Sequence, residues 1–156
     1  MAYLICFLMS MVPVVELRGA MVYAVVVEGL PEIPALLVCV AGNMLPIPFI
    51  YFFARKLLQW GAKKRYAGKL CRVFLDKGER GGNKLVKKAG RGGLFVALML
   101  FVGIPLPGTG AWTGALAASF LKMGIRSTTL AVSLGVVIAG IIMTVLSNLG
   151  LHIFGF

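Results

Sequence analysis

The residues best suited to chemistry in this chain are Glu16 and Arg18, which interrupt an otherwise apolar stretch. They are the only charged side chains before Glu28. A charged side chain at the centre of a bilayer costs about 2.5–3.5 kcal/mol on insertion scales, so such residues usually face a cavity or a partner. Two interpretations are open at this point. The pair is a substrate or proton site, or it forms a salt bridge that only holds a turn.

A second candidate site is the run Pro105-Leu106-Pro107-Gly108-Thr109-Gly110. Prolines and glycines exclude a regular helix here, and irregular backbone is tolerated at membrane depth only where protein buries it or water reaches it. Thr109 is a suitable N-cap for the helix that follows. This helix and another starting at Gly19 would point their positive ends toward the midplane, which with Arg18 predicts an anion-favouring cavity. A structural turn without ligand is the alternative.

A third candidate is the interruption of an apolar run by Asn43, Pro46 and Pro48. The prolines free backbone carbonyl groups for a ligand, although a kink with Asn43 bonded to a neighbouring helix is an equal alternative. Trp112 is a further candidate for lining a pathway. The predicted substrate or ion site comprises Glu16, Arg18, Gly19, Asn43, Pro46, Pro48, Pro105, Pro107, Gly108, Thr109, Gly110 and Trp112.

The sequence offers no pattern for enzymatic chemistry. It has no Ser/His/Asp array, no Walker loop and no cluster with metal-ligand spacing, and its three cysteines are odd in number without a CxxC motif. We therefore expect neither an enzyme, nor a metal site, nor a cofactor.

The composition places these residues in a membrane. The chain has 156 residues, is 60% hydrophobic and has a mean hydropathy of +0.95, which is typical of a single membrane domain. About 20 helical residues cross the hydrocarbon layer. Residues 35–53 and 128–149 meet that length, whereas the runs 1–15, 19–27, 94–106 and 111–121 are each roughly half a span at about 1.5 Å per residue.

Residues 55–91 hold 13 of the 16 Lys and Arg and, with Asp76 and Glu79, account for the whole net charge of +11. Such a segment beside apolar runs predicts a cytoplasmic loop on anionic lipid rather than a nucleic-acid site. Tyr66, Leu70 and Phe74 recur every four residues and predict an amphipathic helix, ended by Gly78, on the inner membrane surface. The basic residues expected to contact lipid headgroups are Lys63, Lys64, Lys69 and Arg72.

The charges also predict a topology. Lys122 and Arg126 place the start of the second span inside, so residues 94–121 begin and end on the cytoplasmic side as a re-entrant hairpin. Arg18-Gly19-Ala20 and Thr109-Gly110-Ala111 lie 91 residues apart in similar settings, which indicates an inverted repeat. We predict an all-α integral membrane protein with two full transmembrane helices, two re-entrant helical hairpins and a basic amphipathic cytoplasmic helix. Residues 1–54 and 94–156 are the repeats, joined by the cytoplasmic linker 55–93. A chain this short is also expected to form a homodimer.

Three stretches carry a family resemblance: residues 13–20, 42–50 and 101–115, with 135–140 fitting as well. They resemble the putative small multidrug export protein family, which is distantly similar to the DedA superfamily. That resemblance implies paired re-entrant hairpins in the bacterial or archaeal cytoplasmic membrane. It also implies central roles for Glu16, Arg18, Asn43 and the 105–110 tip. Some members of the superfamily are implicated in returning undecaprenyl phosphate across the inner membrane.

Three functions follow as hypotheses. The first is a transporter or flippase for an anionic or amphipathic substrate, such as a lipid phosphate, with membrane lipids and the transported molecule as partners. The second is a proton-coupled exporter of small cationic drugs, with Glu16 exchanging the proton. The third is a membrane scaffold whose basic amphipathic helix binds anionic lipid or recruits partners.

Overall fold

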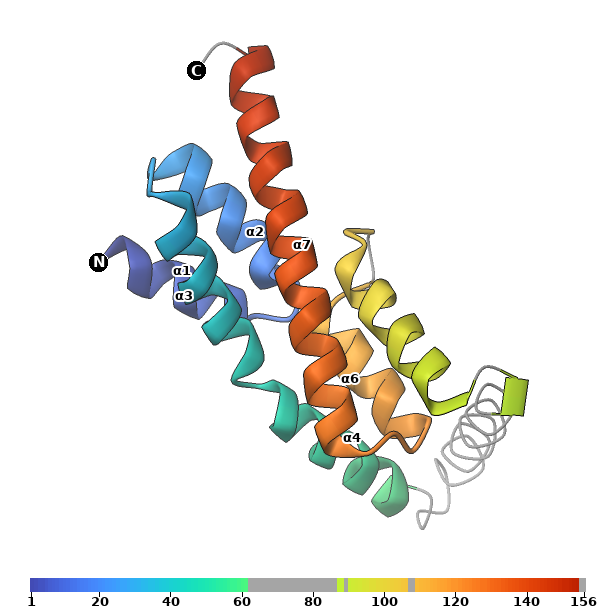
Figure 1. Cartoon of the computed structure of the whole chain (residues 1–156). Helices are drawn as coiled ribbons and strands as arrows, with labels where there is room; N and C mark the ends of the chain where they lie inside the picture. Colours follow the sequence, from blue (N-terminus) through green and yellow to red (C-terminus); the bar gives the residue numbers. More distant parts are fainter. Residues whose placement is uncertain (62–86, 89, 107–108, 155–156) are drawn as a thin grey trace.

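The computed structural model describes residues 1–61, 87–88, 90–106 and 109–154, and every regular element in these ranges is a helix (Figure 1). The predicted amphipathic helix lies outside the described residues, together with its headgroup contacts Lys63, Lys64, Lys69 and Arg72. The helices, in chain order, are α1 (Ala2–Met11), α2 (Glu16–Val22), the π-helix η1 (Tyr23–Val27), α3 (Glu32–Met44), α4 (Ile47–Gly61), a helix over Gly90–Gly103, α6 (Ala111–Phe120) and α7 (Ile125–Phe154).

Among the described residues, two helical stretches are long and apolar enough to cross a membrane. They are Glu32–Ala54 and Ile125–Gly150, and they confirm the two apolar spans predicted at 35–53 and 128–149. The first bends where α3 gives way to α4, at Leu45 and Pro46. Proline supplies no backbone N–H and its ring crowds the preceding turn, so the local sequence itself fixes this break.

The remaining helices form two helix–turn–helix units, one of α1 and α2 and one of the Gly90–Gly103 helix and α6. Their apolar helices are short: α1 and α6 have 10 residues each, which is about 15 Å of helix and half of a hydrocarbon layer. In Figure 1 the two units lie on opposite sides of α7, and both α2 and α6 pack against it.

Small residues let these helices approach closely, as is usual in membrane proteins. A Cβ added to Gly42 on α3 would meet Ser10 and the backbone of Phe7 on α1. A Cβ added to Gly114 on α6 would come within 2.5 Å of Val102. Replacing such a glycine would therefore force two helices apart.

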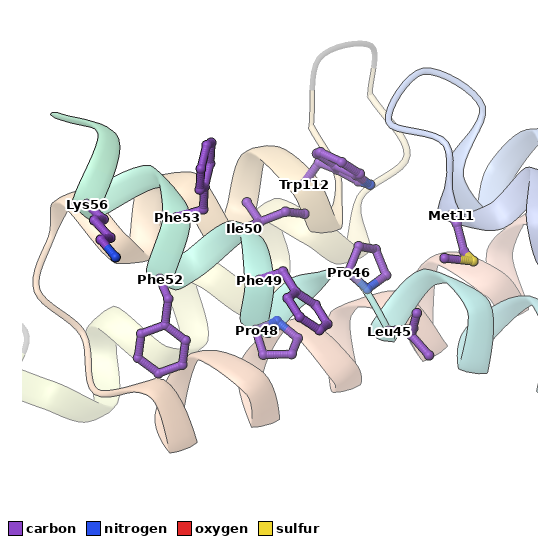
Figure 2. A pocket seen from close by; sticks show the side chains of 10 residues that line it. All are labelled: Met11, Leu45, Pro46, Pro48, Phe49, Ile50, Phe52, Phe53, Lys56 and Trp112. Atoms are coloured by element: carbon purple, nitrogen blue, oxygen red, sulfur yellow. The ribbon is translucent and has the colours of Figure 1, made fainter. Parts of the chain in front are cut away.

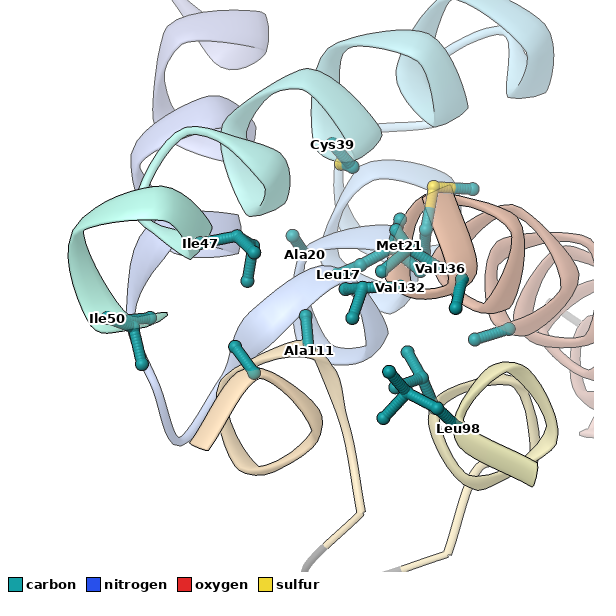
Figure 3. Packing of buried hydrophobic residues seen from close by; sticks show 14 of the residues in the cluster. Leu17, Ala20, Met21, Cys39, Ile47, Ile50, Leu98, Ala111, Val132 and Val136 are labelled. Atoms are coloured by element: carbon teal, nitrogen blue, oxygen red, sulfur yellow. The ribbon is translucent and has the colours of Figure 1, made fainter. Parts of the chain in front are cut away.

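The core joins both units to α7. Leu17 and Met21 from α2 are buried together with Val132 and Val136 from α7, and Ala111 of α6 closes the cluster from the other side (Figure 3). Because one cluster holds the first turns of α2 and α6 together, the polar residues next to those turns are also brought into contact.

Candidate functional site between the two helix pairs

Arg18 binds the end of the Gly90–Gly103 helix and the turn that follows it. Its Nη1 donates to the carbonyl of Leu106 at 2.6 Å, and its Nη2 lies 3.2 Å from the carbonyl of Ile104 and 3.4 Å from that of Val102. The same Nη2 donates to the hydroxyl of Thr109 at 2.8 Å. A planar guanidinium presents several donors in one fork, which suits a cluster of carbonyl oxygens.

Glu16 binds the beginning of the next helix. Its Oε1 accepts the backbone N–H of Trp112 at 3.2 Å, and the N–H of Ala111 also interacts with the carboxylate. Ala111 and Trp112 are the first two residues of α6, where the backbone N–H groups have no partner within the helix. Glu16 is only 6% exposed, so this contact is made away from solvent.

Glu16 and Arg18 together match both helix dipoles of the second unit. The carboxylate lies at the positive start of α6 and the guanidinium at the negative end of the Gly90–Gly103 helix. Each such contact contributes about 0.3–1 kcal/mol at exposed sites and about 2 kcal/mol in partly buried ones. The spacing of two residues therefore lets a single turn of α2 bind both ends of the 104–110 connection.

Glu16 itself has a left-handed backbone, with φ at 50°. This conformation is uncommon for residues other than glycine and costs of order 1–3 kcal/mol when tertiary structure imposes it. The chain accepts that strain at the residue whose carboxylate reaches α6, which is typical of functional sites.

Gly110 is required next to this carboxylate. Its φ is 148°, and a Cβ at this position would overlap all three terminal atoms of Glu16, Oε1, Oε2 and Cδ. Gly110 is also the N-cap of α6 and provides no side-chain bond. The prediction that Thr109 caps α6 is therefore wrong: its hydroxyl accepts from Arg18 and lies 2.8–2.9 Å from the carbonyls of Leu106 and Ile104.

The structure also differs from the prediction of an anion-favouring cavity. The anion at the start of α6 is the chain's own Glu16, and Arg18 directs its donors to carbonyls and Thr109. The second helix end expected there is absent because α2 begins at Glu16 and contains Gly19 in its interior. A Cβ on Gly19 would come within 2.5 Å of Val15, so this glycine serves the tight entry into α2.

Three other predicted residues border one apolar groove of about 800 Å³. Pro46, Pro48 and Trp112 line it with residues of α4 (Figure 2). Figure 2 shows Lys56 at one end of the groove and Met11 at the other. Sequence reasoning missed Lys56 and the aromatic residues Phe49, Phe52 and Phe53; the aromatic run directly after Pro48 was the signal that could have found them.

Asn43 and Trp112 each bury a polar atom without a hydrogen-bond partner. These atoms are Oδ1 of Asn43, a residue 2% exposed, and Nε1 of Trp112. A buried polar atom without a partner costs about 1–3 kcal/mol, so each is a candidate position for a ligand or water. Under the alternative in which Asn43 bonds a neighbouring helix, its Oδ1 does not make that bond.

Pro105 lies in the connection that Arg18 binds, whereas Pro107 and Gly108 are outside the described residues. Across the described ranges no three His, Cys, Asp or Glu side chains gather to hold a metal ion.

The described residues form only helices, two of them long apolar stretches, with the buried carboxylate of Glu16 and the half-buried guanidinium of Arg18 between the shorter helices; such a chain belongs to the class of polytopic membrane proteins. Within that class, the chain belongs to the putative small multi-drug export protein family, whose model matches residues 16–142. The match begins at Glu16 and includes the residues through which α2 contacts the Gly90–Gly103 helix and α6. Comparison with curated proteins and with solved structures gave no match.

Proposed function

We propose that the protein moves an amphipathic molecule with an anionic headgroup across the cytoplasmic membrane, through a site where two re-entrant hairpins meet. The observation that carries this proposal is the position of Trp112. Its backbone N–H binds the carboxylate of Glu16, while its side chain lines the apolar groove. Trp112 thereby connects the polar site at Glu16 with an apolar groove that is large enough for a hydrocarbon chain.

Helix length supports the re-entrant placement of both units. The helices of the second unit, Gly90–Gly103 and α6, are each too short to cross about 30 Å of hydrocarbon. Irregular backbone at 104–110 then lies near the midplane, where it needs protein or water to satisfy it. Arg18, which belongs to the first unit, donates hydrogen bonds to the carbonyls of Ile104 and Leu106 in this connection. The family's export name agrees with a transport role.

The groove indicates the apolar part of the substrate. Its walls are almost wholly apolar, and Lys56 is the one charged residue among the described residues that line it. A hydrocarbon chain in the groove with a negative group attracted by Lys56 meets both features, and a lipid phosphate such as undecaprenyl phosphate belongs to this chemical class. Trp112 Nε1 is buried beside the groove without a hydrogen-bond partner, so a shift of the indole toward the groove would offer it to such a headgroup.

The test is transport in proteoliposomes of a fluorescent lipid phosphate, scored by accessibility to a quencher outside. We expect Arg18→Ala to abolish transport. Because Arg18→Ala also removes structural contacts, Lys56→Gln is measured in parallel, since its side chain lines the groove. Wild-type transport in both variants would overturn the proposal, and so would the absence of any lipid phosphate movement with the intact protein.

The burial of Glu16 favours a second candidate function, the proton-coupled export of small drugs. Glu16 is the one buried carboxylate among the described residues, and a carboxylate at a family-matched membrane site is suited to exchange protons. This function predicts that Glu16→Gln abolishes the drug resistance that the intact protein gives to cells. An intact protein that gives no resistance would exclude it.

We further propose that two copies assemble in the membrane, since one chain with two spans encloses little of a pathway. Chemical crosslinking in native membranes tests this, and an exclusively monomeric product would contradict it.

A further inference from the structure

Two cysteines face each other where the first short helix packs against the first span. Cys6 lies on α1 and Cys39 on α3, and both side chains are fully buried. Both are free thiols, and a side-chain hydrogen bond links them. Two reactive groups 33 positions apart in the chain are thereby in contact inside the protein.

The packing of α1 against α3 explains this pairing. The buried residues of α1 are Cys6 and Ser10, which are four positions apart and therefore share one face of the helix. On α3, Cys39 and Gly42 are both buried and share a face in the same way. A Cβ added to Gly42 would meet the hydroxyl of Ser10 and the backbone carbonyl of Phe7. Ser10 thus faces Gly42 one turn after Cys6 faces Cys39.

This interface suits a covalent bond between the two sulfur atoms. A disulfide requires Cα atoms within about 7 Å and Cβ atoms that point toward each other. One turn from Cys39, Gly42 lets the helices approach until a Cβ on it would overlap α1. Because the thiols already form a hydrogen bond, a disulfide needs movement of the side chains rather than of the helices.

The surroundings of the two thiols favour a neutral product. Both cysteines belong to a cluster of buried apolar side chains that includes Ala20, Ala24 and Ala35. A metal ion held there by two thiolates would bring charge into this cluster, which is costly. Protein zinc sites also use at least three protein ligands, and among the described residues no group of three His, Cys, Asp or Glu side chains gathers. A disulfide replaces two S–H groups without adding charge.

We propose that Cys6 and Cys39 form a disulfide when a small hydroperoxide, such as hydrogen peroxide, oxidises them. One thiol loses its proton and attacks a peroxide oxygen. An S–O bond forms, the O–O bond breaks, and the released hydroxide takes up that proton as water. The second thiol then attacks the sulfenic sulfur. The S–S bond forms, the S–O bond breaks, and the oxygen leaves as a second water with the second thiol's proton. The thiols lose two electrons, which the peroxide gains.

The position of the pair suits a small, uncharged oxidant. Cys39 is seven residues, about 10 Å of helix, from Glu32 at the start of the span, so the oxidant enters the apolar layer only partway. The bond would fix α1 to α3. Because α1 ends at Met11, which lines the apolar groove, it would also fix that end of the groove wall. This chemistry is independent of the transport function proposed above.

The experiment counts the free thiols of the full chain in neutral detergent before and after treatment with hydrogen peroxide, which catalase then removes. N-ethylmaleimide added in denaturant marks every remaining thiol, and the intact mass gives the number of adducts. The untreated chain takes three adducts, one for each cysteine. We expect the oxidised chain to take one, and its digest without reductant to contain a peptide linked through Cys6 and Cys39. Three adducts after treatment, sulfinic or sulfonic acids in place of the link, or a link from either cysteine to Cys71 would overturn the proposal.

Two variants with equal numbers of cysteines separate contact in the fold from random pairing. Cys6→Ala should take two adducts both before and after treatment, whereas Cys71→Ala should change from two adducts to none. Equal behaviour of these two variants would contradict the proposed pair.

A third variant moves one thiol off the interface. Cys39→Ala with Leu37→Cys keeps three cysteines but places the thiol about 200° around α3, at a position where the leucine is 65% exposed. We expect linkage to position 6 to be at least about tenfold slower than in the wild type, because the thiols no longer start in contact. The melting temperature of this variant is measured to confirm that it folds. Linkage as fast as in the wild type would show that the α1–α3 contact does not direct the bond, and would overturn the proposal.

Discussion

Arg18 and Thr109 touch each other: the guanidinium donates a 2.8 Å hydrogen bond to the threonine hydroxyl across 91 positions of sequence. These are the same two positions that the sequence pairs as equivalents in its two halves, Arg18-Gly19-Ala20 and Thr109-Gly110-Ala111. In an inverted repeat, equivalent residues can meet only beside the pseudo-two-fold axis. The contact lies where the pseudo-two-fold axis of the predicted inverted repeat would pass.

Gly110→Ala should destabilise the protein by about 2 kcal/mol or more, because the new Cβ overlaps the Glu16 carboxylate at a φ that L-residues rarely adopt. The measurement is the melting temperature in detergent. Gly124→Ala is the matched control, since a Cβ there meets nothing within 4 Å. Equal melting temperatures for the two variants would show that Glu16 does not occupy this position.

Arg18→Lys should retain part of the stability that Arg18→Ala loses. A lysine keeps the charge but cannot spread its donors over three carbonyls and Thr109 as the guanidinium does. Each hydrogen bond that a carbonyl loses from this charged donor is worth about 1.5–3 kcal/mol. Thermal unfolding should rank wild type above the Lys variant and the Lys variant above the Ala variant. If the Lys variant is as unstable as the Ala variant, the positive charge at position 18 does not by itself contribute to stability.

Glu16→Gln separates the structural role of this carboxylate from a functional one. Glutamine keeps an oxygen that accepts the N–H of Trp112 but removes the charge at the start of α6, which costs about 0.3–1 kcal/mol. We expect a small drop in melting temperature and a loss of transport of at least about tenfold, equivalent to 1.4 kcal/mol. Unimpaired transport with the same small drop would reduce Glu16 to a helix-capping residue.

Trp112→Phe should leave stability close to wild type, because it removes an Nε1 that has no protein partner and retains most of the ring. Transport should fall if the indole N–H binds the substrate headgroup. Trp112→Ala, which removes a wall of the groove, should reduce both stability and transport. A Phe variant that melts far below wild type would indicate that Nε1 makes a bond within the protein.

Cysteines placed singly at positions 93 and 122 of a cysteine-free variant should react with a membrane-impermeant reagent only from the cytoplasmic side. A cysteine at position 28 should react only from outside. This pattern follows if residues 94–121 enter and leave on the same face, as the short helices Gly90–Gly103 and α6 favour. Labelling of 93 and 122 from opposite faces would exclude the re-entrant arrangement and the transport site built on it.

The prediction of elements succeeded where a single stretch of sequence contains the cause. The two spans follow from unbroken apolar length, and the break at Pro46 follows from the missing N–H of proline. Thr109 was assigned the wrong role because a threonine before a helix resembles an N-cap until a distant guanidinium competes for its hydroxyl. The π-helix η1 was not predicted, since its local sequence of tyrosine, alanine and valines carries no signal for it.

By itself, the sequence determined that this chain is a helical membrane protein and that the charges interrupting its first apolar stretch stand at positions 16 and 18. Only the tertiary structure decided what they bind: Glu16 binds the start of α6, and Arg18 binds the end of the helix before it. The tertiary structure also places Trp112 in the wall of the apolar groove. Apolar length is a property of neighbouring residues and can be read along the chain. Hydrogen bonds across 84–96 positions depend on how Leu17, Val132 and Ala111 pack, which no local pattern specifies.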